Sequence, residues 1–292
     1  LSVPIAGSTG YTGTILNAGE IENKGVELTL SGSPLKLANG FTWDASINWS
    51  TNRNEVIKLA PNVDEIGLSG FTSITSSAVV GFAYGTFFGT DWERDASGNV
   101  LIEDNPNSPS FGYPIVNPTF QPIGDPNPDW IAGIRNTFSY KGLSLSFLFD
   151  IREGGDIWNG TRGALVTMGT DAATLARGTY ATFDGVLASS GAPNDISVPL
   201  SETWFRGNGG GFGNQAKQFV EEGSWVRLRD ISLSYSLPAS LISKTPLNGV
   251  DITLTGRNLW LKTTYSGIDP ETNLTGNSNG FGFEYFNMPN TK

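Results

Sequence analysis

Two short groups of polar and aromatic residues have the side-chain types that bind an uncharged sugar. One group is Asp156, Trp158, Asn159 and Arg162, and the other is Trp204 and Arg206. An indole ring stacks on the face of a sugar ring, while carboxylate, amide and guanidinium groups hydrogen-bond its hydroxyls. We predict these residues as candidates for substrate binding. The alternative is packing within the loop or contact with a partner protein, and this is the more common role of such residues in a loop.

Catalytic and metal-binding chemistry has little support. The chain contains no Cys and no His, which excludes thiolate and imidazole zinc sites and also nucleophilic triads that use His. Glu221 and Glu222 are neighbours, but successive residues of a strand point apart, so they form no catalytic pair. Residues 91–99 offer oxygen ligands without the spacing of an EF-hand, which leaves a calcium site as a minor alternative. We predict no enzymatic activity, no cofactor and no metal.

The net charge of −10 indicates which kinds of partner the chain can bind. No cluster of Lys and Arg offsets this charge, so the chain would repel the phosphates of a nucleic acid. Nucleic acid is therefore not an expected partner.

Apolar and polar residues alternate over stretches of about ten residues, the pattern of β-strands with two different faces. From Phe41 to Ser50 every odd-numbered residue is apolar and every even-numbered one is polar. Similar patterns predict strands at residues 20–33, 41–56, 129–140, 143–153, 224–237 and 250–262. The alternation changes phase near Arg229 and Asp230, where we expect a bulge or a strand end.

The connections between these strands alternate in length. Short links lie at 34–40, 141–142 and 238–249, and long ones, rich in Gly, Asn, Asp and Pro, at about 57–128, 154–223 and 263–283. Bacterial outer-membrane barrels have short periplasmic turns and long extracellular loops, and no apolar run is long enough for a membrane helix. We therefore predict an all-β fold: a transmembrane antiparallel β-barrel segment of about six full strands, with partial strands at the ends and long extracellular loops.

Some order is expected inside the loops. Residues 85–89 and 99–102 flank a turn at 95–98 and look like a hairpin, and 161–177 could form a short helix. Aromatic side chains near strand ends would lie at the membrane surface, where a ring half in lipid is favourable. On the extracellular side these are Trp49, Trp225, Trp260 and Tyr265.

Several phrases of the sequence resemble a known family. Residues 17–28 (NAGEIENKGVEL) resemble a signature of TonB-dependent receptors. Five further phrases, in the same order along the chain, resemble the SusC/RagA subfamily: residues 124–130 (GDPNPDW), 136–142 (NTFSYKG), 225–235 (WVRLRDISLSY), 256–260 (GRNLW) and 265–271 (YSGIDPE). Each phrase is short, but together they are specific.

This resemblance implies a larger machine. Such transporters have a barrel of about 22 strands with a plugged lumen. Residues 1–292 would be the C-terminal portion of that barrel. The plug domain would precede Leu1, where the chain opens without a Met, and the final strand would be absent, since the chain ends soon after residues 281–286. The resemblance also implies an outer-membrane location in contact with lipid, a SusD-like lipoprotein lid, energy supplied through TonB, and import of an oligosaccharide or peptide. A passive outer-membrane receptor or porin, and a secreted β-rich adhesin or carbohydrate-binding module, remain alternatives.

Overall fold

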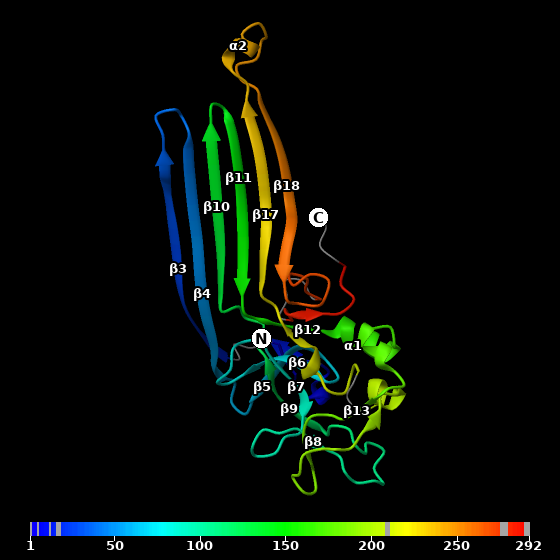
Figure 1. Cartoon of the computed structure of the whole chain (residues 1–292). Coiled ribbons are helices and arrows are strands. Elements are labelled where there is room, and N and C mark those ends of the chain that lie inside the picture. The colour runs from blue at the N-terminus through cyan, green and yellow to red at the C-terminus, as the bar shows by residue number, and fades with distance from the viewer. Residues whose placement is uncertain are drawn as a thin grey trace.

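A six-stranded antiparallel sheet dominates the computed structural model, which describes residues 2–4, 6–11, 13–15, 19–207, 211–274 and 280–288. Its strand order is β18-β17-β11-β10-β4-β3 (Figure 1). The strands are β3 (Gly19–Lys36), β4 (Thr42–Leu59), β10 (Trp130–Tyr140), β11 (Leu143–Glu153), β17 (Trp225–Ser236) and β18 (Asp251–Thr263). The predicted all-β class is confirmed, and each predicted strand has its counterpart. Asn17 and Ala18, which open the first family motif, lie outside the described residues.

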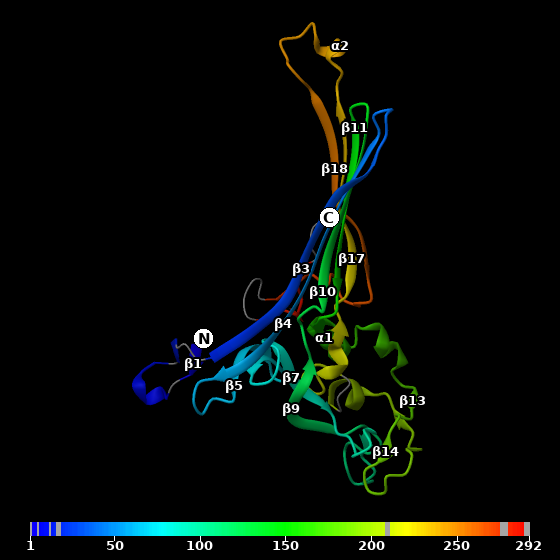
Figure 2. The same ribbon diagram turned by 90° about the vertical axis from the view of Figure 1, so that its left-hand side faces the viewer.

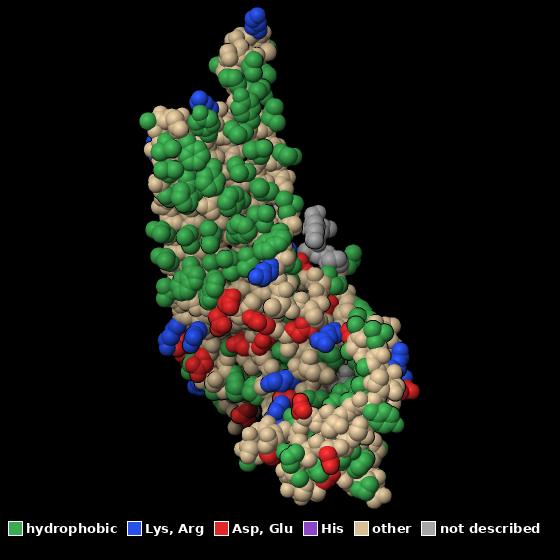
Figure 3. Space-filling model, in the orientation of Figure 1, with side chains coloured by type: hydrophobic (Ala, Val, Ile, Leu, Met, Phe, Trp, Pro, Cys, Tyr) green, Lys and Arg blue, Asp and Glu red, His purple; other side chains and the backbone are tan. Residues whose placement is uncertain are grey.

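The two faces of this sheet differ in polarity. Figure 3 shows one face covered with hydrophobic side chains along the length of the strands, ending at a band of acidic and basic residues. Val26, Leu28 and Leu254 on this face remain 58%, 55% and 75% exposed. On the other face, the Arg135 guanidinium is paired with the Asp230 carboxylate at 3.0 Å. A monomer in water rarely exposes so large an apolar surface, so this face requires an apolar surrounding.

Aromatic pairs across neighbouring strands hold the apolar face together. The ring of Phe138 on β10 stacks on Trp43 of β4, with centroids 5.9 Å apart, and lies 6.0 Å from Phe147 of β11. Asn136 is the one polar residue that interrupts this face of β10. Its side-chain oxygen accepts a hydrogen bond of 3.0 Å from the indole nitrogen of Trp43. The interruption therefore satisfies a donor that would otherwise face an apolar surrounding.

Local backbone features follow from the sequence. The register of β17 shifts between Leu228 and Asp230 against both neighbouring strands, which confirms the predicted bulge. Lys141 and Gly142 both have positive φ, 47° and 84°, as the tight turn between two twisted strands requires. Gly25 lies so close to the backbone of β4 that a Cβ would collide with the carbonyl oxygen of Thr51. Its lack of a side chain therefore permits the β3–β4 pairing at this point.

The long connections fold together at one end of the sheet, below it in Figure 1 and in the turned view of Figure 2. A four-stranded sheet in the order β5-β6-β7-β9 forms in the first connection. Its strands are β5 (Glu65–Phe71), β6 (Ile74–Val79), β7 (Thr86–Trp92) and β9 (Val116–Gly124). Pro118 and Pro122 fit β9 because it lies at the edge of this sheet, where a strand tolerates missing donors.

The second and third long connections meet in a three-stranded sheet. It has the order β16-β12-β19, formed by β12 (Asp156–Asn159), β16 (Val220–Glu222) and β19 (Phe283–Glu284), and α1 (Gly160–Met168) follows β12 directly. A shared hydrophobic core joins both sheets and α1. Its buried members are Ile74, Phe87, Ile123, Trp158, Val166, Phe205, Ala216, Phe219 and Phe283. The loops therefore form one packed body.

The remaining elements are short. Three two-stranded pairs are β1 (Ser2–Pro4) with β2 (Gly13–Ile15), β8 (Leu101–Ile102) with β14 (Val186–Leu187), and β13 (Tyr180–Ala181) with β15 (Val198–Pro199). Helical turns lie at Gly7–Thr9, Ala172–Ala176, Thr203–Gly207 and Lys217–Phe219, and α2 (Ala239–Ile242) lies in the link between β17 and β18. Among the described residues, no helix combines the length and the apolar character needed to cross a membrane.

Three expectations about loops and aromatic residues need correction. The turn at 95–98 forms, but the segment 85–89 does not pair with 99–102. Residues 86–89 belong to β7, which pairs with β6 and β9, and Phe87 and Phe88 are buried there. The segment 161–177 contains α1 and a separate 3-10 turn, divided at Gly169, whose φ is 74°.

The aromatic residues expected at the membrane surface also divide into two kinds. Trp260 is 46% exposed and Trp49 is half-buried, so a position at the membrane surface stays a prediction for these two. Trp225 and Tyr265 are only 7% and 5% exposed, so the prediction is wrong for these two. Both side chains are buried, and the sequence pattern did not reveal this packing.

Candidate functional site

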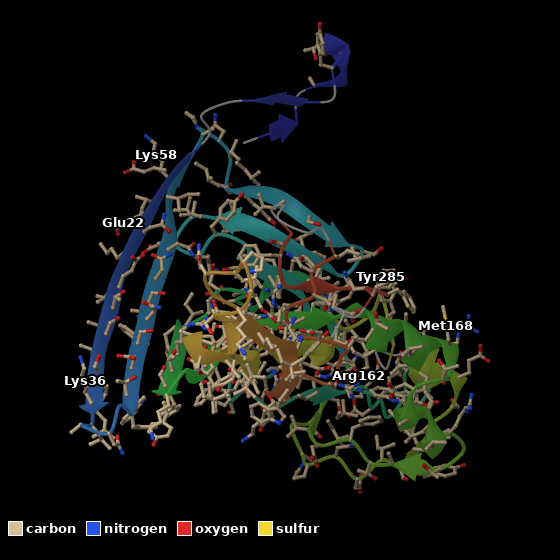
Figure 4. All side chains as sticks on the ribbon, turned by 90° about the horizontal axis from the view of Figure 1, so that it is seen from above. Glu22, Lys36, Lys58, Arg162, Met168 and Tyr285 are labelled. Atoms are coloured by element: carbon tan, nitrogen blue, oxygen red, sulfur yellow. The ribbon has the colours of Figure 1, made fainter. Side chains whose placement is uncertain are left out.

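The predicted binding residues separate into two that line a cavity beside α1 and four that lie elsewhere. The cavity has a volume of about 550 Å³ and is named here the α1 cavity. Its polar lining residues are Asn159, Thr161, Arg162, Asp171, Ser266 and Glu284, and Leu165 and Ile268 are among the apolar ones. In Figure 4, Arg162 and Tyr285 lie on the side of the molecule away from the β3–β4 edge, which Glu22 and Lys36 mark.

Asn159 and Arg162 are placed by the start of α1. The Asn159 side-chain oxygen accepts a hydrogen bond of 3.0 Å from the backbone N–H of Arg162, which caps the helix. The Asn159 amide nitrogen donates to Glu221 at 3.1 Å and to the Ser266 hydroxyl at 3.2 Å. Arg162 pairs with the same Glu221 carboxylate at 3.2 Å. Both residues thus hold the site together as well as lining it.

Glu221 is the residue on which this side of the cavity depends, and the sequence analysis missed it. Its carboxylate also accepts hydrogen bonds of 2.8 Å from the backbone and the hydroxyl of Ser266. One carboxylate therefore joins α1, β16 and the third long connection. Its neighbour Glu222 turns away, as strand geometry predicts, and accepts from the Ser224 hydroxyl at 2.7 Å.

Glu284 is a second carboxylate that sequence reasoning did not single out. It is completely buried, and its Oε1 accepts a hydrogen bond of 2.7 Å from the Thr161 hydroxyl. Its Oε2 and the hydroxyl of Tyr265 are both buried, and the two side chains lie close together. Burial, followed by the charges of Glu284 and Glu221, raises the pKa of Tyr265, which therefore stays protonated at neutral pH.

Asp156 and Trp158, on β12, have positions that fit structural roles. Trp158 is 1% exposed and contacts the rings of Phe71 and Phe283 in the core, so its face is not available to a sugar. Asp156 accepts a hydrogen bond of 2.8 Å from the backbone N–H of Asp125, and burial raises the pKa of its carboxyl. For these two residues, packing within the loops describes the geometry better than ligand contact.

Trp204 and Arg206 lie in the turn Thr203–Gly207, away from the α1 cavity. Trp204 stacks on Trp92, at 6.1 Å between centroids, and on Tyr113, at 5.8 Å, so it joins the first and second long connections. Arg206 is exposed and pairs with Glu202 at 2.8 Å. Neither residue contributes to the lining of the α1 cavity.

An ionic network fixes the third long connection to the sheet. Arg227 on β17 is 3% exposed, and it pairs with Asp269 at 2.7 Å and with Glu271 at 2.8 Å. Arg229 pairs with Glu271 at 2.8 Å and with Asp150 of β11 at 2.6 Å. These contacts join two of the sequence motifs, residues 225–235 and 265–271. The same connection carries Ser266 and Ile268 into the α1 cavity.

Curated relatives match nearly the whole chain, although no family model does. TonB-dependent receptor P26 of Formosa agariphila is 30% identical over 297 residues, and P3 of the same organism is 28% identical over 312. These alignments cover 97% and 99% of this chain and 29% of each relative. TonB-dependent receptor SusC of Bacteroides thetaiotaomicron is 23% identical over 92% of this chain and 26% of that protein. The chain thus spans less than a third of the length of these relatives.

Solved structures share the fold. The RagAB peptide transporter matches with a TM-score of 0.65 and 21% identity over 99% of this chain and 30% of that one. The RagAB peptide importer in its 'open-open' state matches with a TM-score of 0.62 and 20% identity over 97% and 29%. The chain therefore belongs to the TonB-dependent receptors, the family that its sequence motifs resemble.

Proposed function

We propose that this chain forms barrel wall and outer loops of a TonB-dependent importer, which carries an oligosaccharide or a peptide across the bacterial outer membrane. The observation that carries the proposal is the sheet with one apolar, exposed face and one face of paired charges. Such a sheet is stable where lipid covers the first face and a polar lumen lies against the second. The curated relatives of this chain are named TonB-dependent receptors.

In this proposal the packed loops face the outside of the cell and the short links face the periplasm. Other segments of the protein would supply the remaining wall, the plug and the contact with TonB. The loop body would bind the substrate and a SusD-like lipoprotein lid. The relative solved as the RagAB peptide transporter supports import, and the relative named SusC supports the same class of machine.

Deletion of the gene for the complete protein in its own bacterium tests this function. Growth would be measured on a panel of glycans and peptide mixtures as sole carbon source, with and without a complementing copy. We expect loss of growth on one class of substrate, recovery on complementation, and the same loss when TonB is removed.

The outcomes separate the alternatives. Growth that depends on the gene but not on TonB would indicate a passive receptor or porin. Recovery of the protein from the culture medium, without detergent, would indicate a secreted adhesin or carbohydrate-binding module. Purification in mild detergent should also bring down a lipoprotein lid, identified by mass spectrometry.

A further inference from the structure

The link between β17 and β18, residues 237–250, projects beyond the other short links of the sheet (Figure 1 and Figure 2). Tyr235 on β17 pairs with Leu143, the first residue of β11, so this row marks where the neighbouring β10–β11 hairpin ends. A strand of 11 residues, the length of β10, is long enough to span a bilayer. The link therefore lies just beyond the level at which the neighbouring strands would leave the hydrocarbon.

This link is folded by contacts of its own. The backbone N–H of Leu237 donates to the carbonyl oxygen of Val250 at 2.9 Å, which closes the base of the link, and α2 begins directly after Pro238. Ile242, the last residue of α2, is 8% exposed. Its carbonyl oxygen accepts hydrogen bonds from the backbone and the hydroxyl of Thr245, at 2.8 and 2.7 Å. The link therefore holds its outer side chains in fixed positions.

The outer side chains of the link include two leucines and one cation. Leu241 is 66% exposed and Leu247 is 54% exposed. Lys244, between them in sequence, is the only charged residue of 237–250. The nearest carboxylate, that of Asp251, lies on the polar face of the sheet, where it accepts a hydrogen bond from the Ser236 hydroxyl. Exposed leucines beside a lysine suit the boundary between hydrocarbon and lipid phosphates, because the leucines enter the lipid while the ammonium stays in the headgroup layer.

We propose that residues 237–250 anchor the wall in the periplasmic leaflet of the outer membrane, where Leu241 and Leu247 insert among the phospholipids and Lys244 binds their phosphates. Continuity of the apolar surface favours lipid over a soluble periplasmic protein. At the loop end the apolar face stops at a band of charged residues, whereas hydrophobic side chains continue from the face in Figure 3 onto the link. The anchor rests on the proposed function only in placing lipid against this apolar face.

The complete receptor, reconstituted in nanodiscs of phosphatidylethanolamine and phosphatidylglycerol, tests this contact. Leu241→Cys and Leu247→Cys would each carry a dye whose emission depends on its surroundings. The chain has no Cys of its own, and the receptor without an added Cys gives the background. Lipids brominated on their acyl chains quench a dye that touches them. We expect both labels to emit at shorter wavelength than in water and to lose fluorescence in brominated lipid.

Matched positions calibrate these labels. Leu30 is 63% exposed, and its row crosses β10 at Ile134, near the middle of that strand, so Leu30→Cys should show the strongest quenching. Asn248 is exposed and polar beside Leu247, so Asn248→Cys should show the weakest. Lys244→Glu should lower the quenching at both leucines, because a carboxylate is repelled by lipid phosphates, while Lys244→Arg should preserve it.

The outcomes separate the anchor from the barrel wall. Labels at Leu241 and Leu247 that emit as in water, or that are quenched no more than the label at Asn248, would overturn the anchor while Leu30→Cys stays quenched. The link would then face the periplasm, available to a soluble partner. Loss of quenching at Leu30 as well would overturn both the anchor and the proposed barrel wall. Unchanged quenching in Lys244→Glu would overturn the contact of Lys244 with phosphate.

Discussion

At the scale of single residues, the buried charges are paired with groups far away in the sequence. Arg227 binds two carboxylates of the third long connection while its guanidinium also lies 5.6 Å from the ring of Trp225. A buried pair contributes little against an apolar replacement of both partners, but breaking it leaves a charge without compensation. The contribution of such a pair is therefore tested best by removing one partner.

Replacing Arg227 with Met should destabilise the attachment of residues 264–274 to the sheet. Asp269 would remain buried without its partner, a loss on the order of 3–5 kcal/mol. Thermal unfolding in detergent and limited proteolysis of this connection would measure the effect. Arg206→Met is the matched control, because its partner Glu202 is exposed and such pairs contribute little. Equal behaviour of the two variants would contradict the proposed anchoring role.

Asp156 gives a prediction about pH. Burial raises the pKa of its carboxyl above the value in the unfolded chain, so the folded state binds a proton more readily. Its contribution to stability is full below the unfolded pKa and is lost as pH rises through the folded pKa.

Asp156→Asn should therefore be more stable than the natural protein at neutral pH. The amide oxygen can still accept the hydrogen bond from Asp125, and the advantage should shrink as pH falls toward 4, the ordinary range of a carboxyl. Unfolding temperatures measured from pH 7 to pH 4 would show this convergence. A constant difference across the range would indicate that the charge of Asp156 is not responsible.

At the scale of elements, the sequence predicts the strands of the large sheet well and the loop body poorly. The six strands have two faces in different surroundings, so their residues alternate, and the bulge appears as a change of phase at Arg229. Strands β6 and β7 are buried on both faces, as the successive residues Ser76 and Ser77 on β6 and Phe87 and Phe88 on β7 show, and no alternation marks them. Their pairing depends on contacts between distant segments.

The candidate site was predicted only in part for the same reason. Asn159 and Arg162 lie near a strand end, and they were predicted as binding residues because their side chains can hydrogen-bond a ligand. Glu221 hydrogen-bonds Asn159 across 62 residues of sequence. Glu284 hydrogen-bonds Thr161, in the helix that Asn159 caps, across 123 residues. Nothing in the local sequence around either carboxylate distinguishes it from an exposed one. Trp158 was misleading because a Trp of a folded loop and a Trp of a binding face have the same local pattern.

The pairing of β3 with β4 offers a test within one strand. Gly25→Val should weaken this pairing by about 1–3 kcal/mol, because the added atoms collide with the Thr51 carbonyl oxygen. Gly32→Val on the same strand is the control, since nothing lies within 4 Å of its Cβ position. Denaturant unfolding of the refolded receptor would compare them. A larger loss for Gly32→Val would show that the close approach at Gly25 is not what matters.

At the scale of the whole molecule, the sheet has two faces of different polarity and the loops pack together at one of its ends. Leu254 is 75% exposed on the apolar face, and Thr253 on the opposite face pairs with Ser234 at 2.9 Å. The two residues are neighbours in sequence but face different media in the proposed barrel. They therefore give a direct measure of the orientation of the wall.

Leu254→Arg should reduce folding into lipid vesicles more than Thr253→Arg, but only moderately, because Leu254 lies three residues from the end of β18. An Arg on the lipid face of a barrel costs about 2–4 kcal/mol near the middle of the bilayer and little near the surface. Folding yield would be followed by the shift of heat-sensitive mobility on gels. Equal yields for the two variants would argue against lipid on the apolar face.

The bulge at Arg229 has a consequence for how this wall can evolve. In a regular strand, Arg229 and Asp230 would point to opposite sides, and one charge would enter the apolar face. With the extra residue, Arg229 reaches Asp150 and Asp230 reaches Arg135, both on the polar side. Two successive ions of opposite sign thus share one side without any change in the pattern that faces outward. The residues on the polar face of the strand can therefore change while the apolar pattern of its other face stays the same.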